Sequence, residues 1–362
     1  MKKLFVIAAA LVTLAACNKN NPVEIPNLAG DNAIGFSAYT ASPVTKGTVA
    51  TAPENIGVFA FYQPAVGGAA SNFSTKKYAT PDFMYNQSVK VADGTYAPVK
   101  YWPNNANDQL SFFAYAPYKD GMTWEDMGIE TDINATKMTV SFPVYDSVAD
   151  QVDYLWSDPV LNQAKPAVDK KIEFKFNHIM SQINLFVAAE TDKAEDKPIA
   201  WTDATTTITV EKVEFAGLAE SLDFEYTIPI SGETTPTATG SQDIVLTAAD
   251  FDNDNKTSAA WKDNKFYQLN NAASTMFVAP QKLGNVVITY TVATVDSQNA
   301  ANNSTITNVI TADMSELTLA AGKSYQLNFL IGMTSVKFKV TVEGWEETVI
   351  EKQIDVPANT AA

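Results

Sequence analysis

The fold of this chain is decided by two short apolar runs and the polar link between them: IGFSAYT (Ile34–Thr40), SPVTKGT (Ser42–Thr48) and IGVFAFY (Ile56–Tyr62). In the first run Ile34, Phe36 and Ala38 alternate with Gly, Ser and Tyr. A period of two is typical of a β-strand that buries one face. The pattern therefore predicts strands on both sides of the link.

The link differs in kind from its neighbours. Pro43 lacks a backbone donor, and Gly47 adds conformational freedom. We expect the link to be exposed and accessible to a protease, with Lys46 as its basic residue. A chain cut there could lose its first strand and leave a vacancy in the sheet.

Composition favours a globular, mostly β protein. Of 362 residues, 46% are apolar and only 18% charged, which is unlike a disordered chain. Val, Thr, Phe and Tyr are plentiful, and no long stretch has helical periodicity. The net charge of −16 argues against nucleic acid as a partner, because phosphate binding requires clustered cations. All basic residues are lysine, so an arginine-specific protease would have no site.

The single cysteine, Cys17, follows the pattern of a bacterial lipobox. A basic start at Lys2 and Lys3 precedes the apolar run Leu4–Leu14 and the small residues of LAAC. We expect residues 1–16 to be a signal peptide, Cys17 to be acylated and residues 17–31 to form a tether to the outer membrane. The alternative is an ordinary secretory peptide with a chance cysteine. One cysteine excludes an intrachain disulfide.

Beyond the link, apolar runs and turn clusters alternate about every ten residues, which is typical of a β-sandwich. A polar stretch with a proline, Asn162–Pro166, predicts a boundary between domains at 32–165 and 166–347, followed by a tail at 348–362. The run Ile172–Leu185 reads as two strands separated by a kink. Other predicted strands are 82–89, 96–103, 109–117, 207–215, 275–280, 286–292, 324–329 and 336–345.

Several of these runs, in order, resemble the fimbrillin family of type V pilus subunits over nearly the whole chain. They are the lipobox, Ile34-Gly35-Phe36, Thr45-Lys46-Gly47, Phe83–Asn86, Lys100–Pro103, Ser111–Pro117, Phe176-Asn177-His178, Ala321–Tyr325 and Glu343-Gly344-Trp345. Each is only a strand with a turn. The ordered set carries the resemblance.

The resemblance implies two transthyretin-like β-sandwich domains and a lipoprotein exported to the cell surface as part of a fimbrium. It further implies cleavage between Lys46 and Gly47, and loss of the strand that contains Ile34, Phe36 and Ala38. The vacated groove would take the C-terminal segment of another pilin subunit. A lysine-specific or trypsin-like protease is then required, unlike the arginine-cut members. No acidic run follows Cys17, so surface export is inferred from the family alone.

The tail is the candidate donor strand. Ile350, Ile354 and Val356 share one parity, interrupted by Lys352. Their burial could contribute roughly 5–8 kcal/mol before ordering costs. The alternative is that the tail pairs with its own sheet or frays.

No enzyme, metal or cofactor site is predicted. The only histidine, His178, lies in an apolar strand and is interpreted as structural. Asp250–Asn255 resembles a calcium loop but has Asn255 and Trp261 where that loop needs Gly and Glu. Gly67-Gly68 lacks the Lys and Ser or Thr of a phosphate loop. Because pairs of carboxylates are common in this sequence, the sequence alone does not exclude a glycosidase.

The competing hypothesis is an unprocessed surface lipoprotein, either a pilus anchor or a glycan-binding module. The latter would stack sugars on aromatic residues, which in a β-sandwich belong by default to the core. The candidate platforms are Trp102, Trp156, Trp201, Trp261 and Trp345.

Overall fold

The structure is a computed structural model that describes residues 23–24, 32–40, 53–73, 80–92, 94–128, 136–167, 171–189, 204–228, 236–261, 265–332, 336–344 and 350–354. Their regular elements are β-strands and three short 3-10 helices, η2 (Val148–Asp150), η3 (Ala272–Ser274) and η4 (Ala300–Asn302). The predicted all-β class is confirmed. Within these ranges, no helix has the length and apolar character needed to span a bilayer.

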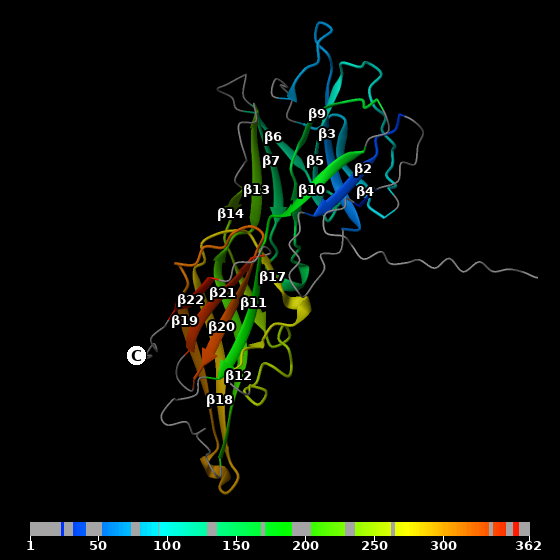
Figure 1. Cartoon of the computed structure of the whole chain (residues 1–362). Coiled ribbons are helices and arrows are strands. Elements are labelled where there is room, and N and C mark those ends of the chain that lie inside the picture. Colours follow the sequence, from blue (N-terminus) through cyan, green and yellow to red (C-terminus); the bar gives the residue numbers. More distant parts are fainter. Residues whose placement is uncertain are drawn as a thin grey trace, which may run out of the picture.

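The strands form four sheets in an elongated molecule (Figure 1). Two sheets occupy the upper half of the view and two the lower half. We name each sheet after one of its strands.

The β2 sheet has the order β1-β2-β10-β8-β5-β3-β4, with β9 also paired to β5. Most of β3 and β5 is buried, as expected for a sheet covered on both faces. Its strands are β1 (Val23–Glu24), β2 (Phe36–Thr40), β3 (Asn55–Gln63), β4 (Met84–Lys90), β5 (Gln109–Ala116), β8 (Leu155–Ser157), β9 (Val160–Ala164) and β10 (Ile172–His178).

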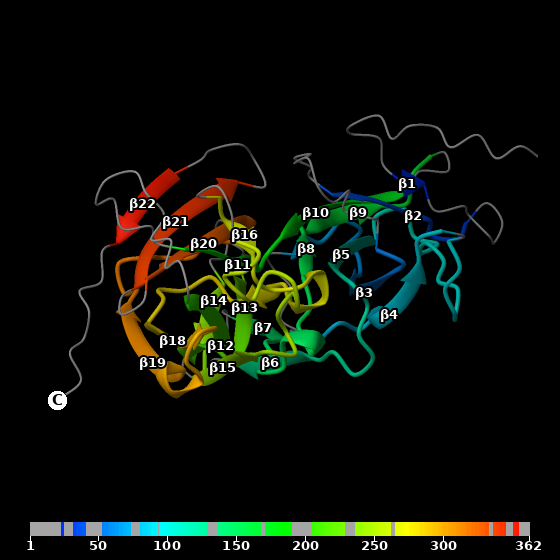
Figure 2. The same cartoon turned by 90° about the horizontal axis from the view of Figure 1, so that it is seen from below.

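This sheet curls on itself, as the end-on view shows (Figure 2). The ring centroids of Phe36 in β2 and Phe112 in β5 lie 5.9 Å apart, although β10 and β8 separate these strands in the sheet. The concave face thus encloses a core of its own. Its larger members include Ile34, Phe36, Ile56, Val58, Trp102, Leu110, Phe112, Phe174 and Phe176.

The opposite face of the β2 sheet packs on the β13 sheet. That sheet has the order β14 (Thr237–Thr239), β13 (Ser221–Ile228), β7 (Thr136–Pro143) and β6 (Trp124–Gly128). Aromatic rings fill the interface. Phe59 lies 5.1 Å from Trp124, and Phe142 lies 5.8 Å from Trp156, between ring centroids.

Two further sheets form the lower half. The β20 sheet contains β16 (Tyr267–Gln268), β11 (Ser181–Ala189), β20 (Lys323–Ile331), β21 (Val336–Gly344) and β22 (Ile350–Ile354), with β17 (Met276–Val278) also on β11. The β18 sheet contains β15 (Gln242–Thr247), β12 (Ala204–Leu218), β18 (Asn285–Asp296) and β19 (Ser304–Asp313).

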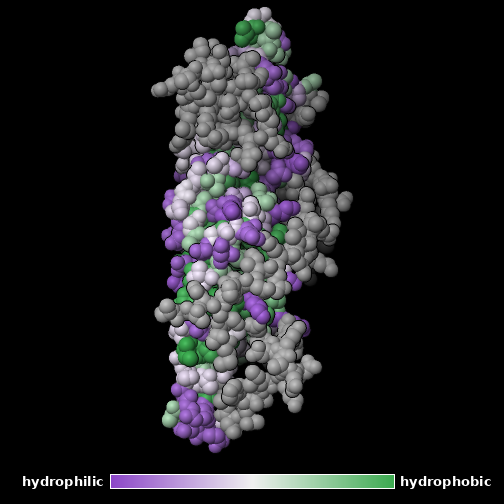
Figure 3. Space-filling model, turned by 90° about the vertical axis from the view of Figure 1, so that its left-hand side faces the viewer, coloured by the Kyte–Doolittle hydropathy of each residue, from purple (hydrophilic) through white to green (hydrophobic). Residues whose placement is uncertain are grey.

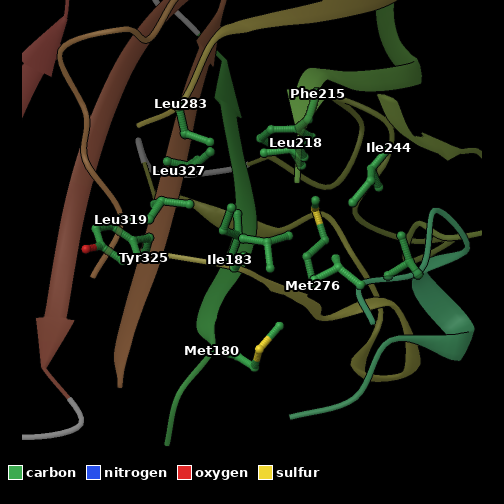
Figure 4. Close-up of a cluster of buried hydrophobic side chains, with 14 of the residues drawn as sticks. Met180, Ile183, Phe215, Leu218, Ile244, Met276, Leu283, Leu319, Tyr325 and Leu327 are labelled. Carbon is green, nitrogen blue, oxygen red and sulfur yellow. The ribbon is translucent and has the colours of Figure 1, made fainter. Parts of the chain in front are cut away.

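These two sheets bury apolar side chains between them (Figure 4). Ile183 and Leu327 project from the β20 sheet toward Phe215 and Ile244 of the β18 sheet, and all four are buried. The cluster continues into the β13 interface described above. The sheets are therefore joined through one continuous core.

Three chain segments run from one half into the other. β10 lies in the β2 sheet and β11 in the β20 sheet, with only Ile179 and Met180 between them. The kink predicted between Ile172 and Leu185 is therefore present. In the same way β12 of the β18 sheet leads through Ala219 and Glu220 into β13 of the upper half. β14 of the upper half then leads through Gly240 and Ser241 into β15 of the β18 sheet.

Sheet membership does not change at residue 166, where we predicted a boundary. β10 follows that position yet pairs with β2 and β8. β13 pairs with β7, which precedes it. Both upper sheets thus contain strands from either side of the predicted boundary, and the division into two transthyretin-like domains stays a prediction.

Candidate functional site

β2 lies next to the end of its sheet, and among the described residues its outer side pairs only with the two-residue strand β1. On its inner side it runs parallel to β10, with a register from Phe36 opposite Ile172 to Thr40 opposite Phe176. The Ile172 N–H also donates to the Gly35 carbonyl at 2.8 Å. Five register pairs therefore hold β2 to the remainder of the sheet.

The predicted β2 side chains lie in the concave core. Ile34, Phe36 and Ala38 are all buried, and Phe36 has no exposed surface. Its ring contacts Tyr96, Phe112 and Phe174 at centroid distances of 5.6, 5.9 and 5.7 Å. Burying a phenylalanine side chain contributes about 1.5–3 kcal/mol. The strand is thus a structural part of the core in this state.

The residues that precede β2 are held by the segment 96–102. The Ile34 N–H donates to the Lys100 carbonyl at 3.0 Å, and the Trp102 N–H donates to the Asn32 carbonyl at 3.0 Å. The Tyr96 hydroxyl donates to the Ile34 carbonyl at 2.7 Å. Burial raises the pKa of Tyr96, which keeps this phenol a neutral donor.

This segment corrects a prediction. We expected a strand over 96–103, but the structure has only an isolated bridge between Tyr101 and Ala33 there. Two prolines, which lack backbone donors, fit poorly into a ladder. Tyr96 of this segment covers Phe36 instead, a role that no sequence signal indicated.

The surface left by β2 would be an apolar groove, which we call the β2 groove. It is formed by the rings of Tyr96, Phe112 and Phe174 and by the backbone edge of β10. An edge with unpaired N–H and C=O groups beside apolar pockets is a template for another strand.

The tail places Ile350 and Ile354 in β22, the end strand of the β20 sheet. β22 pairs antiparallel with β21, from Ile350 opposite Val342 to Ile354 opposite Phe338. The tail therefore pairs with its own sheet in this state, as one of the two sequence interpretations expected. Val356, Cys17, Lys46 and Gly47 lie outside the described residues.

The polar candidates have structural partners. His178 Nδ1 lies 2.8 Å from the Asp153 Oδ2 carboxylate oxygen. Asp252 Oδ1 accepts the N–H groups of Asp254 and Asn255, which closes a turn within its own loop. Among the described residues, no cluster of three His, Cys, Asp or Glu could hold a metal ion.

The described tryptophans named as sugar platforms, Trp102, Trp156 and Trp261, are buried. Trp201 and Trp345 lie outside the described residues. Buried rings offer no flat face to a glycan, so these three belong to the core.

Fold and site define a class of protein: an all-β chain in which an early strand completes an aromatic core and the last described strand lies at a sheet edge. Residues 42–345 match a family model described as fimbrillin-like. The chain belongs to this fimbrillin-like family and is a pilus-related protein with a structural or adhesive role.

A solved structure with a TM-score above 0.5 shares the fold. A fimbrial protein from Bacteroides vulgatus is 20% identical with a TM-score of 0.58, covering 87% of this chain and 100% of that chain. The fimbrial anchor protein Mfa2 from Porphyromonas gingivalis is 9% identical with a TM-score of 0.33, covering 86% of this chain and 98% of its own. No curated protein matches the sequence.

Proposed function

We propose that this chain is a structural subunit of a bacterial cell-surface pilus that supports adhesion. It is exported as a lipoprotein acylated at Cys17, cleaved after Lys46 and assembled by donor-strand exchange. The observation that carries the proposal is the position of β2: it completes an aromatic core from near the end of its sheet and precedes Lys46 in the chain.

β2 can be removed by a single cut because it precedes Lys46 in the chain. A cut between Lys46 and Gly47 separates everything up to Lys46 from the rest of the molecule. β2 then leaves together with the residues before it, and no part of the chain has to thread through the sheet. The lipid on Cys17 leaves with the same fragment, which frees the subunit from the membrane.

The vacated groove attracts a strand for two reasons. Its β10 edge offers unpaired backbone groups, and its pockets expose Tyr96, Phe112 and Phe174 to water. Backbone pairing supplies the general attraction, while alternating side chains set the register.

The tail of a second subunit is the proposed donor. β22 must first leave β21, which gives up five register pairs, the same number that β2 makes with β10. The backbone pairing lost at β21 is therefore about equal to the pairing gained at β10. The free-energy difference has to come from Ile350, Ile354 and Val356 entering the apolar pockets.

N-terminal sequencing and intact mass of the protein sheared from cells test the proposal. A chain that begins at Gly47 supports a polymerising subunit. A surface population that begins only at acylated Cys17 contradicts it and supports the alternative, an unprocessed surface lipoprotein that is a pilus anchor or a glycan-binding module. Binding of polysaccharide by the purified monomer would then separate those two.

A further inference from the structure

The end strand β19 is the least protected sheet edge in the described part of the chain. It is ten residues long and pairs only with β18 there. Most other end strands of five residues or more carry charged residues: Lys90 in β4, Glu125 and Asp126 in β6, Asp243 in β15, and Glu351 and Lys352 in β22. The exception, β9, is uncharged but only half as long as β19. β19 carries one charge, on its last residue Asp313, and the nine residues from Ser304 to Ala312 are the longest uncharged run among these end strands. Charged residues are the usual means by which edge strands resist pairing with other chains.

β19 also exposes apolar side chains on both faces. Ile306 is 58% exposed and Val309 is 59% exposed. Ile306 lies opposite Val292 and Val309 opposite Thr289 in β18, so the two residues point to opposite sides of the sheet. Figure 3 faces the side on which β19 lies in Figure 1, and hydrophobic residues are exposed in its lower half.

The sequence of β19 is nearly a palindrome in side-chain type. Around Asn308 it reads STIT-N-VITA. If two copies pair antiparallel with a twofold axis at Asn308, Thr305 lies opposite Thr311 and Ile306 opposite Ile310. Thr307 then lies opposite Val309, and Ser304 opposite Ala312. At nearly every position a β-branched residue therefore lies opposite another β-branched residue, which is a favoured cross-strand pairing.

We propose that β19 pairs antiparallel with β19 of a second copy of this chain, so that the two β18 sheets become one continuous sheet. All neighbours in the β18 sheet are antiparallel, so this pairing continues its geometry. A twofold contact needs a self-complementary surface, and the palindrome provides one. With a net charge of −16, copies repel each other, and an uncharged edge is where close approach costs least.

The contact is independent of strand exchange, because it uses neither β2 nor the tail. It is tested on the full chain carrying Cys17→Ser, so that no acyl group is attached, and Lys46→Ala, so that β2 is retained. Sedimentation equilibrium over a concentration series then measures the dimer without polymerisation. A dimer is expected in this uncut chain.

Substitutions that introduce a charge test whether the dimer contact lies at the β19 edge. Val309→Lys or Thr307→Glu alone should weaken the dimer at least about tenfold, because each puts an unpaired charge into the ladder. Val309→Lys with Thr307→Glu puts opposite charges at facing positions and should restore the dimer. Val245→Lys on β15, at the other edge of the same sheet, is the matched control and should leave the dimer unchanged.

Two results overturn the proposal: a chain that stays monomeric over the whole series, or a dimer that Val309→Lys and Thr307→Glu leave intact. Circular dichroism of each variant confirms that the monomer is folded. Loss of the dimer on Val245→Lys but not on Val309→Lys would place the contact at β15 and would equally reject β19.

Discussion

The ring of Phe36 in β2 stacks on the ring of Phe174 in β10, with centroids 5.7 Å apart and planes inclined by 13°. These residues are two positions out of register, since Phe174 pairs with Ala38, so the stack crosses the ladder diagonally. The stack joins β2, the strand that we propose is lost, to β10, the strand on which the donor strand would pair.

Phe36→Ala should lower the free energy of unfolding of the uncut chain by about 3–5 kcal/mol, because it leaves a cavity among three rings. Urea denaturation measures the loss. Phe266→Ala, at a partly exposed phenylalanine, serves as the control and should cost much less. Equal losses at both positions would mean that the concave core does not depend on β2.

Lys46→Ala should leave the fold intact and abolish both processing and polymer. The substitution removes the only basic residue of the link. Intact mass and electron microscopy of the cell surface are the readouts, with Lys165→Ala at an exposed lysine as the control. Normal pili on cells that carry Lys46→Ala would refute cleavage at this position.

A peptide of residues 346–362 should bind the chain cut after Lys46 and not the uncut chain, because β2 fills the groove until the cut is made. Isothermal titration calorimetry measures the difference, and a peptide of the same composition in scrambled order is the control. Equal affinity for cut and uncut chains would show that the peptide binds elsewhere.

Gly57→Ala should be strongly destabilising. Gly57 lies opposite Tyr115 between β3 and β5, and a methyl group on Gly57 would overlap the Tyr115 ring. The Tyr115 hydroxyl is fixed by a bond to Asn86 Oδ1 at 2.7 Å, so the ring cannot simply move aside. We expect a loss of about 1–3 kcal/mol. In a Tyr115→Leu background the same substitution should cost less, and an unchanged cost would reject this explanation.

Tyr154→Phe should raise the free energy of unfolding at neutral pH by about 1 kcal/mol. The Tyr154 hydroxyl is buried with no hydrogen-bond partner in the described part of the structure, and desolvation without a bond is unfavourable. Thermal unfolding at pH 7 checks the direction. A lower melting temperature for the variant would indicate that the hydroxyl has a partner.

The same residue makes stability depend on alkaline pH. Burial raises the pKa of Tyr154 to about 12, whereas an unfolded tyrosine titrates near 10. The unfolded chain therefore loses its proton first, and stability falls as pH rises from about 10 to about 12. The fall should be smaller in Tyr154→Phe than in the unmodified chain.

Sequence periodicity predicted the strands with clear apolar runs. β3, β5, β10 and β11 all lie where alternation or an apolar run indicated them. It could not name their partners, since β2 and β10 are far apart in the chain and pair in parallel. The apolar residues in 96–103 suggested a strand. Buried residues that pair with no neighbouring strand give the same apolar pattern in the sequence as a true strand does.

The candidate site was predictable in part. The alternation of Ile34, Phe36 and Ala38 indicated a buried face, and the structure places all three in the core. The cover formed by Tyr96 and the stack on Phe174 depend on how the sheet curls, which no local pattern encodes. β19 was not predicted as a strand, because its threonines and asparagine give little hydrophobic contrast.

β10 leads directly into β11, β12 into β13 and β14 into β15, so three stretches of backbone pass through the middle of the molecule along its length. Each is held by ladders in both halves. A pull on the two ends would therefore be borne by covalent bonds and by strands loaded in shear, where many hydrogen bonds must break together. The halves could not be peeled apart one bond at a time, which suits the proposed role as a subunit of a filament exposed to flow.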